Sequence, residues 1–199
     1  MDAPVIRDLL TRPWKHGEAV NLRDVRVTGM LDLTGLALCG VDFSGAVFEG
    51  EVTARGARFD GLAWFKGAHF AAAADFSGAM FVSDARFDAA NFAAKARFSG
   101  AEFRGIADFA QAAFHDAADF RALTCYGNAD FARIRAQGRT SFAGSEFLGG
   151  FWADKAALPA DADLRDTQVH GRLWLRGARR GNAALAERDF GLSFGYCWT

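Results

Sequence analysis

The sequence lacks long apolar runs and disulfide-forming cysteine pairs. None of its 199 residues belongs to an apolar stretch of about eighteen residues, so no transmembrane helix is expected. The first ten residues have no basic region followed by a long apolar core, and we expect no signal peptide. Three cysteines cannot all pair. Together these features predict a reduced, cytoplasmic protein.

The chain also lacks an excess of charge of either sign. The chain has 23 Lys and Arg against 24 Asp and Glu, interspersed, for a formal net charge of -1. A protein that binds DNA or an anionic membrane through electrostatics needs a basic patch, and the sequence shows none. We therefore expect no direct nucleic-acid binding and no membrane binding. The same balance gives little support to an acidic surface that imitates DNA.

Signatures of catalysis are absent as well. The sequence contains no nucleophile elbow, no phosphate-binding loop and no dinucleotide fingerprint. Its four histidines show no metal-ligand spacing, either with one another or with a cysteine. The carboxylates stand mostly between inward-facing positions, where they are solvated. We expect no enzyme activity, no catalytic residue, no cofactor, no metal and no small-molecule substrate.

Phenylalanine, in contrast, is abundant and regularly placed. Two ladders with a period of eleven residues hold 17 of the 20 phenylalanines. The first ladder runs from Phe43 to Leu175 and the second from Phe48 to Val169, so successive ladder positions alternate between five and six residues apart. A fixed internal period indicates a solenoid, in which each repeat buries its apolar face against its neighbours. The spacing matches no multiple of the helical turn, which excludes helix.

Each unit combines a short strand with a corner. A small or apolar residue precedes each ladder position by two, as Ala74 precedes Phe76, and the residue between them is usually polar, as Asp75 is. This in-out-in alternation is typical of extended strand. The remaining residues are rich in Gly, Ser, Ala and Asp, which suit a turn.

These units resemble the pentapeptide-repeat family, whose unit is commonly Ala-Asp/Asn-Leu/Phe-x-x. Matching units begin at Ala74, Ala90, Ala118 and Ala129, and the resemblance covers roughly Leu22 to Leu175. It implies an all-β fold: a right-handed quadrilateral parallel β-helix with four units per coil. Because every second unit carries an extra residue, a coil takes two eleven-residue periods, or 22 residues, with wider corners at two opposite edges. A narrower coil of eleven residues is the alternative.

The repeat predicts three segments: an N-terminal cap over 1–21, a solenoid of about seven coils over 22–177, and a C-terminal cap or dimerisation segment over 178–199. Within the N-terminal segment, Pro4 to Thr11 can form a short helix with Val5, Ile6, Leu9 and Leu10 on one face. A functional arm is the alternative to a cap. The predicted core consists of Phe59, Phe65, Phe70, Phe76, Phe81, Phe87, Phe92, Phe98, Phe103, Phe109, Phe114, Phe120 and Phe131.

Two outward columns follow from a 22-residue coil. One holds Asp42, Trp64, Arg86, Asp108, Asp130, Trp152 and Trp174, and the opposite one Thr53, Asp75, Arg97, Asp119, Ser141 and Asp163. Alternating acid and arginine indicate cross-strand charge pairs, with partial imitation of DNA phosphates as the alternative. Trp152 and Trp174 lie one coil apart, and we expect them in a contact surface or beneath a cap.

The C-terminal tail alternates apolar with small or polar residues, which predicts one strand with an apolar face. Phe190, Leu192, Phe194, Tyr196 and Trp198 form that face. It either covers the last coil of its own chain or packs against a second subunit. We expect a homodimer through this end, with both alternatives open.

The sequence as a whole favours a noncatalytic protein-interaction scaffold with a protein partner. The resemblance implies one alternative, because members of that family protect DNA gyrase or topoisomerase IV from inhibitors as dimeric rods that imitate duplex DNA. This chain lacks the net acidity and the long inserted loop that such a role implies.

Overall fold

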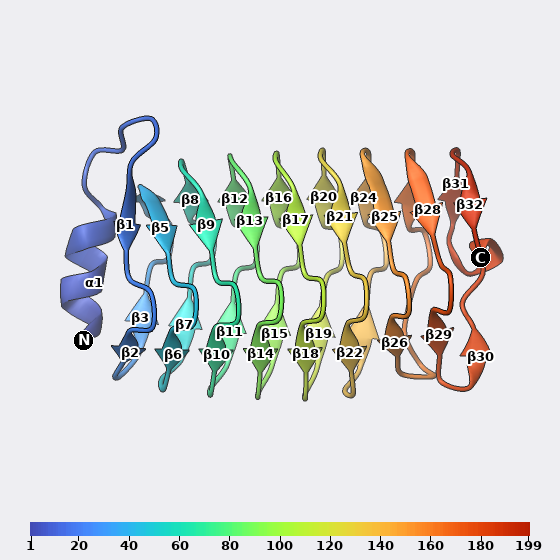
Figure 1. Ribbon diagram of the computed structural model, residues 1–199, viewed down its shortest axis with the longest axis horizontal. Helices are drawn as coiled ribbons and strands as arrows, with labels where there is room; N and C mark the ends of the chain where they lie inside the picture. The colour runs from blue at the N-terminus through green and yellow to red at the C-terminus, as the bar shows by residue number, and fades with distance from the viewer.

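The molecule is a parallel β-solenoid. The computed structural model describes residues 1–199 and shows about eight turns with about 22 residues in each. Figure 1 shows the coils side by side along one axis, with the N-terminal helix at one end and the C-terminus at the other. The predicted fold class is confirmed, and the alternative of an eleven-residue coil is wrong.

Four parallel ladders make up the faces of the rod. Face I contains β1 (Ala19–Asn21), β5 (Gly40–Asp42), β9 (Ala63–Trp64), β13 (Ala85–Arg86), β17 (Ala107–Asp108), β21 (Ala129–Asp130), β25 (Gly150–Trp152), β28 (Arg172–Trp174) and β32 (Cys197–Trp198). Face II contains β2 (Arg26–Val27), β6 (Val47–Phe48), β10 (His69–Phe70), β14 (Asn91–Phe92), β18 (Ala113–Phe114), β22 (Arg135–Ala136), β26 (Ala157–Leu158), β29 (Arg179–Arg180) and β30 (Ala183–Ala184).

The other two faces are shorter. Face III contains β3 (Leu31–Asp32), β7 (Val52–Thr53), β11 (Ala74–Asp75), β15 (Ala96–Arg97), β19 (Ala118–Asp119) and β23 (Thr140–Ser141), and a single bridge from Ser141 to Asp163 extends it by one row. Face IV contains β4 (Ala37–Leu38), β8 (Arg58–Phe59), β12 (Met80–Phe81), β16 (Glu102–Phe103), β20 (Thr124–Cys125), β24 (Glu146–Phe147), β27 (Gln168–Val169) and β31 (Leu192–Ser193).

The register follows the sequence period. Ala63 pairs with Ala85 and Ala74 with Ala96, one 22-residue coil apart. The first coil is one residue shorter, since Ala19 pairs with Gly40. The last coil is longer, because β29 and β30 form an antiparallel hairpin before the chain returns to pair Cys197 with Leu173. The array therefore extends beyond 22–177 at both ends.

The corners are of two kinds. Those that follow faces I and III are two-residue turns whose second residue has positive φ, and this conformation recurs every eleven residues from Gly45 to Gly177. Glycine adopts it without strain. At other corners the same position holds a residue with a side chain, as in Ala89 (φ 56°) and Ala122 (φ 51°). The corners after faces II and IV have the extra residue predicted from the spacing.

Stacked phenylalanines fill the interior. All thirteen predicted core phenylalanines are buried. Rings one coil apart stack nearly parallel, as Phe70 and Phe92 do with centroids 4.7 Å apart and planes 2° apart. Rings that follow opposite faces meet edge to face, as Phe87 after face I and Phe98 after face III do at 5.2 Å. Both arrangements are the ones aromatic rings prefer, so the ladder period produces a favourable core geometry.

Helix α1 (Ala3–Leu10) closes the N-terminal end. Ile6 and Leu10 are fully buried in the common core, and the Leu10 carbonyl accepts a hydrogen bond from the Cys39 amide at 2.8 Å. Val5 is exposed, contrary to the prediction, and Ala3 is buried. The helix therefore covers apolar side chains and binds one free backbone group of the first coil.

The C-terminal tail is not the single strand that the alternation predicts. Phe190 follows a short 3₁₀ turn, η1 (Glu187–Asp189), and is buried against Phe151 with ring centroids 5.6 Å apart. β31 and β32 then continue faces IV and I in parallel pairing. The tail forms part of a further coil, so a corner separates residues that were expected on one strand.

Replacing a ladder phenylalanine tests the core. We expect Phe98→Ala to lower the free energy of unfolding by about 3–5 kcal/mol, because it removes buried apolar surface and leaves a cavity between stacked rings. Arg97→Ala, one residue away and exposed, should change it by less than about 1 kcal/mol. Chemical denaturation measures both, and equal losses would contradict the inward and outward assignment.

The strained corners give a second test. We expect Ala122→Gly to raise the free energy of unfolding by about 0.5 kcal/mol, because relief of the left-handed strain exceeds the extra chain entropy of glycine. Gly100→Ala, at an equivalent corner with φ of 67° and nothing within 4 Å of the added methyl, should lower it by about 1 kcal/mol. In thermal unfolding we expect Ala122→Gly to raise the melting temperature and Gly100→Ala to lower it. A higher melting temperature for Gly100→Ala would contradict this explanation.

Candidate interaction surfaces

The outside of the rod has shallow hollows and no cluster suited to a metal. Three of these hollows measure about 520, 450 and 430 Å³. No group of three or more His, Cys, Asp or Glu side chains lies close enough to hold a metal ion. No helix has the length and apolar character needed to cross a bilayer. The surfaces that can contact a partner are therefore the four faces, their corners and the two ends.

Tryptophans occupy the last three rows of the outward column of face I. Trp152 and Trp174 occupy neighbouring rows of this column, and Trp174 pairs in turn with Trp198, whose ring stacks on it at 5.2 Å. Trp152 and Trp174 are half-buried, and their indole nitrogens are buried without a hydrogen-bond partner. The sequence-predicted pair thus belongs to an aromatic strip that extends to the C-terminal end.

Charge pairing along this column differs from the expected pattern. Arg86 forms no salt bridge with Asp108 and instead lies over the Trp64 ring, 5.1 Å from its centroid. On face III one cross-strand pair does form, between Arg97 and Asp75 at 3.7 Å. Four other pairs join residues two apart within one coil, such as Arg121 and Asp119 at 2.7 Å.

Four carboxylates form an acidic strip along face I and its adjoining corner: Asp88, Asp108, Asp130 and Asp154. Burial raises the pKa of Asp108, and the charges of Asp88 and Asp130 raise it further. Burial also raises the pKa of Asp130, with a contribution from Asp154. Lys66 reaches Asp88 at 3.2 Å and Arg176 reaches Asp154 at 2.9 Å, so the strip is neutralised mainly near its two ends.

Face II carries a chain of polar contacts across successive coils. His69 Nδ1 lies 3.1 Å from Asn91 Oδ1, and Asn91 Nδ2 lies 3.0 Å from His115 Nε2. His115 Nδ1 then lies 3.4 Å from Gln137 Oε1. These histidines join neighbouring coils and take part in a structural ladder.

The cysteines form no disulfide. Cys39 and Cys125 are buried and Cys197 is half-buried. Burial raises the pKa of each thiol above its usual value. Because a thiolate is the reactive form, burial keeps all three thiols in their less reactive, protonated state at neutral pH.

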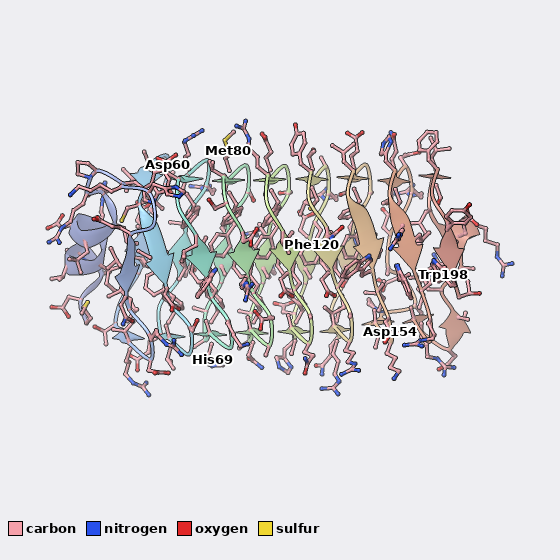
Figure 2. All side chains as sticks on the ribbon, turned by 45° about the horizontal axis from the view of Figure 1, so that its top comes forward. Asp60, His69, Met80, Phe120, Asp154 and Trp198 are labelled. Carbon is pink, nitrogen blue, oxygen red and sulfur yellow. The ribbon has the colours of Figure 1, made fainter.

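The C-terminal end leaves apolar side chains in water. Of the five tail residues predicted to form an interface, Phe190 is 7% exposed and belongs to the core. Leu192, Phe194, Tyr196 and Trp198 are 45%, 62%, 81% and 53% exposed. Phe194 stacks on His170 with centroids 4.9 Å apart. Figure 2 places Trp198 at this end of the rod.

Two surfaces were missed by the sequence argument. The hollow of about 520 Å³ lies between the loop after α1, which contains Trp14, and the corners that join faces IV and I beside Trp64. The hollow of about 450 Å³ lies on face III and is lined by five cationic side chains. The sequence contains the arginines that line this hollow. That they surround a common hollow could not be predicted, because it depends on which corner positions hold alanine.

The acidic strip predicts an unusual pH dependence. The raised pKa of Asp108 means that its charged form destabilises the folded state above that pKa, and that this cost disappears as the pH falls toward the usual value near 3.8. We expect Asp108→Asn to raise the melting temperature at pH 7, with a difference that shrinks toward pH 4.

Asp163→Asn is the matched control. Hydrogen bonds from Arg165 lower the pKa of Asp163 to about 2, so its charged form stabilises the fold above the usual value, and this stabilisation is lost as the pH falls toward 2. The control should lower the melting temperature at pH 7. Calorimetry from pH 3 to pH 7 measures the melting temperatures of both variants. If both substitutions shift the melting temperature in the same direction at pH 7, the opposite roles given to Asp108 and Asp163 are wrong.

Comparison with known proteins agrees with the repeat. A family model described as pentapeptide repeats (9 copies) matches residues 40–80. No curated protein matches the chain. The matched segment runs from β5 to the first residue of β12, and the coils on both sides of it repeat the same strands, corners and register. Residues 40–80 therefore carry pentapeptide repeats, and together with the uniform coils this supports a pentapeptide-repeat protein.

Proposed function

We propose that this pentapeptide-repeat protein is a noncatalytic scaffold that binds a protein partner in the cytoplasm. The observation that carries the proposal is the exposed aromatic end formed by Phe194, Tyr196 and Trp198, continuous with the tryptophan strip of face I. Exposed aromatic clusters of this kind are typical of protein contact surfaces. The three free thiols suit a reducing compartment.

One partner of this end is a second copy of the chain. The tail covers its own last coil with Phe190, yet β31 and β32 remain the outermost strands of faces IV and I. Outermost strands present unpaired backbone groups that can pair with another chain. Two copies related by a two-fold axis would place these strands and the exposed aromatic rings against each other, and such symmetry is the commonest in oligomers.

A charged double variant tests the dimer. We expect the wild-type protein to have a dimeric mass in light scattering at tens of micromolar, and Phe194→Asp with Tyr196→Asp to have a monomeric mass, because charge in an apolar interface is costly. Tyr126→Asp, which changes a ring 51% exposed in the middle of the rod, should remain dimeric. A monomeric wild type, or a dimer that survives the double substitution, would contradict the proposal.

Modulation of DNA gyrase or topoisomerase IV is the second candidate. It is favoured by one observation, the acidic strip of Asp88, Asp108, Asp130 and Asp154, which repeats negative charge along the rod. The net charge of -1 places this role below a general scaffold.

A supercoiling assay separates the two candidates. Gyrase inhibition or protection from an inhibitor at micromolar protein, abolished by Asp108→Asn with Asp130→Asn, would favour topoisomerase modulation. No effect of the wild-type protein would leave the scaffold role with a different partner.

A further inference from the structure

A groove on face III is built differently from the rest of the surface. It crosses β15, β19 and β23 and reaches Asp163, so it covers four successive rows. In its floor, Ser141 is buried and stands where neighbouring rows have Asp119 and Asp163. Small residues also flank it, Ala117 on one side and Ala143 on the other. Three short side chains in adjacent positions therefore leave the hollow of about 450 Å³.

Positive charge surrounds this hollow. Lys95, Arg97, Arg121, Arg139 and Arg165 line it, against only Asp119 and Asp163 among the acidic residues. Arg121 and Arg165 each hold an aspartate through two hydrogen bonds of 2.7 to 2.9 Å. Lys95 and Arg139 have no carboxylate within salt-bridge distance. These two cations remain available for a ligand.

The groove also offers a neutral hydrogen-bond donor. Ser141 Oγ accepts a hydrogen bond from the Ala143 amide at 3.3 Å, and its own proton has no acceptor in the protein. Arg139 lies beside it and also lines the next hollow along the rod. The Ser141 hydroxyl and the Arg139 guanidinium are donors suited to a carboxylate.

We propose that this groove binds an extended acidic peptide segment of the protein partner, an inference that rests on the scaffold function and names the chemistry of its ligand. Four rows about 4.8 Å apart match about four residues of extended chain. Side chains of an extended peptide alternate, so acidic residues at every second position would all face the groove.

The charge balance favours a peptide over nucleic acid. A polyphosphate strand gains affinity from many unpaired cations, and of the five cations here only Lys95 and Arg139 form no salt bridge. Alanine side chains from Ala96, Ala117, Ala118 and Ala143 also line the groove, which suits the apolar side chains of a mixed peptide.

Fluorescence anisotropy with the full-length chain tests the groove. The probe is a dye-labelled hexapeptide of alternating glutamate and alanine, compared with its glutamine analogue and with a single-stranded oligothymidylate. We expect saturable, salt-sensitive binding of the acidic peptide only. Arg139→Glu should weaken it at least about tenfold. Ser141→Asp, which adds a carboxylate to the floor, should weaken it as strongly.

Arg135→Glu is the matched control, because Arg135 is also exposed, makes no salt bridge and lies on face II. Its binding should stay within about twofold of wild type. Unchanged melting temperatures show that the variants are folded. Absence of peptide binding, equal losses in Arg135→Glu and Arg139→Glu, or tighter binding of the oligonucleotide would each overturn the proposal.

Failure of the groove can be separated from failure of the scaffold function. Wild-type protein and Arg139→Glu are used in parallel to capture partners from native lysate. If both proteins retain a partner equally, the groove is not its binding site, but the scaffold function still holds. Loss of that partner in Arg139→Glu, with competition by the acidic peptide, is the result expected here.

Discussion

Stacking of phenylalanine rings between coils is the interaction on which the rest of this structure depends. Neighbouring strands of a sheet lie about 4.8 Å apart, and offset-stacked aromatic rings prefer a similar separation. The centroid distance of 4.7 Å between Phe70 and Phe92 satisfies both requirements at once. An inward position that holds phenylalanine in every coil therefore packs without a change of backbone. Where the ladder changes to Ala153, Phe151 points inward instead and stacks on Phe131 at 5.2 Å, which keeps the column filled.

A core of this kind limits what the surface can be. The interior is continuous and the corners are short, so the rod has no deep cleft. The chemical character of its surface therefore depends on the outward positions, which recur once per coil. A single residue type repeated along such a column makes a strip, as the aspartates beside face I do. A run of small residues makes a hollow, as Ala117, Ser141 and Ala143 do on face III. Both surfaces arise from substitutions that leave the core unchanged.

The sequence was sufficient to predict the features that repeat. Phe65, Phe76 and Phe87 lie in the core, and Asp108 and Trp152 lie in one outward column, because a fixed period transfers the environment of one unit to the next. Features that occur once were harder to predict. The alternation after Phe190 indicated a strand, but the hairpin of β29 and β30 shifts the tail by two residues and turns Phe190 inward. The left-handed corners at Gln111 and Arg133 could not be inferred from residue type, since only their position in the period requires that conformation.

The two ends of the rod differ in a way that bears on function. At the N-terminal end, α1 buries Ile6 and Leu10 and its last carbonyl binds the Cys39 amide, so both the apolar surface and part of the open strand edge are covered. At the C-terminal end, Phe190 buries one ring, while the rings of Phe194, Tyr196 and Trp198 remain in water beside two outermost strands. Eight turns of stacked coil need a cover at each end for the same physical reason. Since the chain leaves the rings of Phe194, Tyr196 and Trp198 exposed together at its C-terminal end, that end is where a second molecule would gain most from binding.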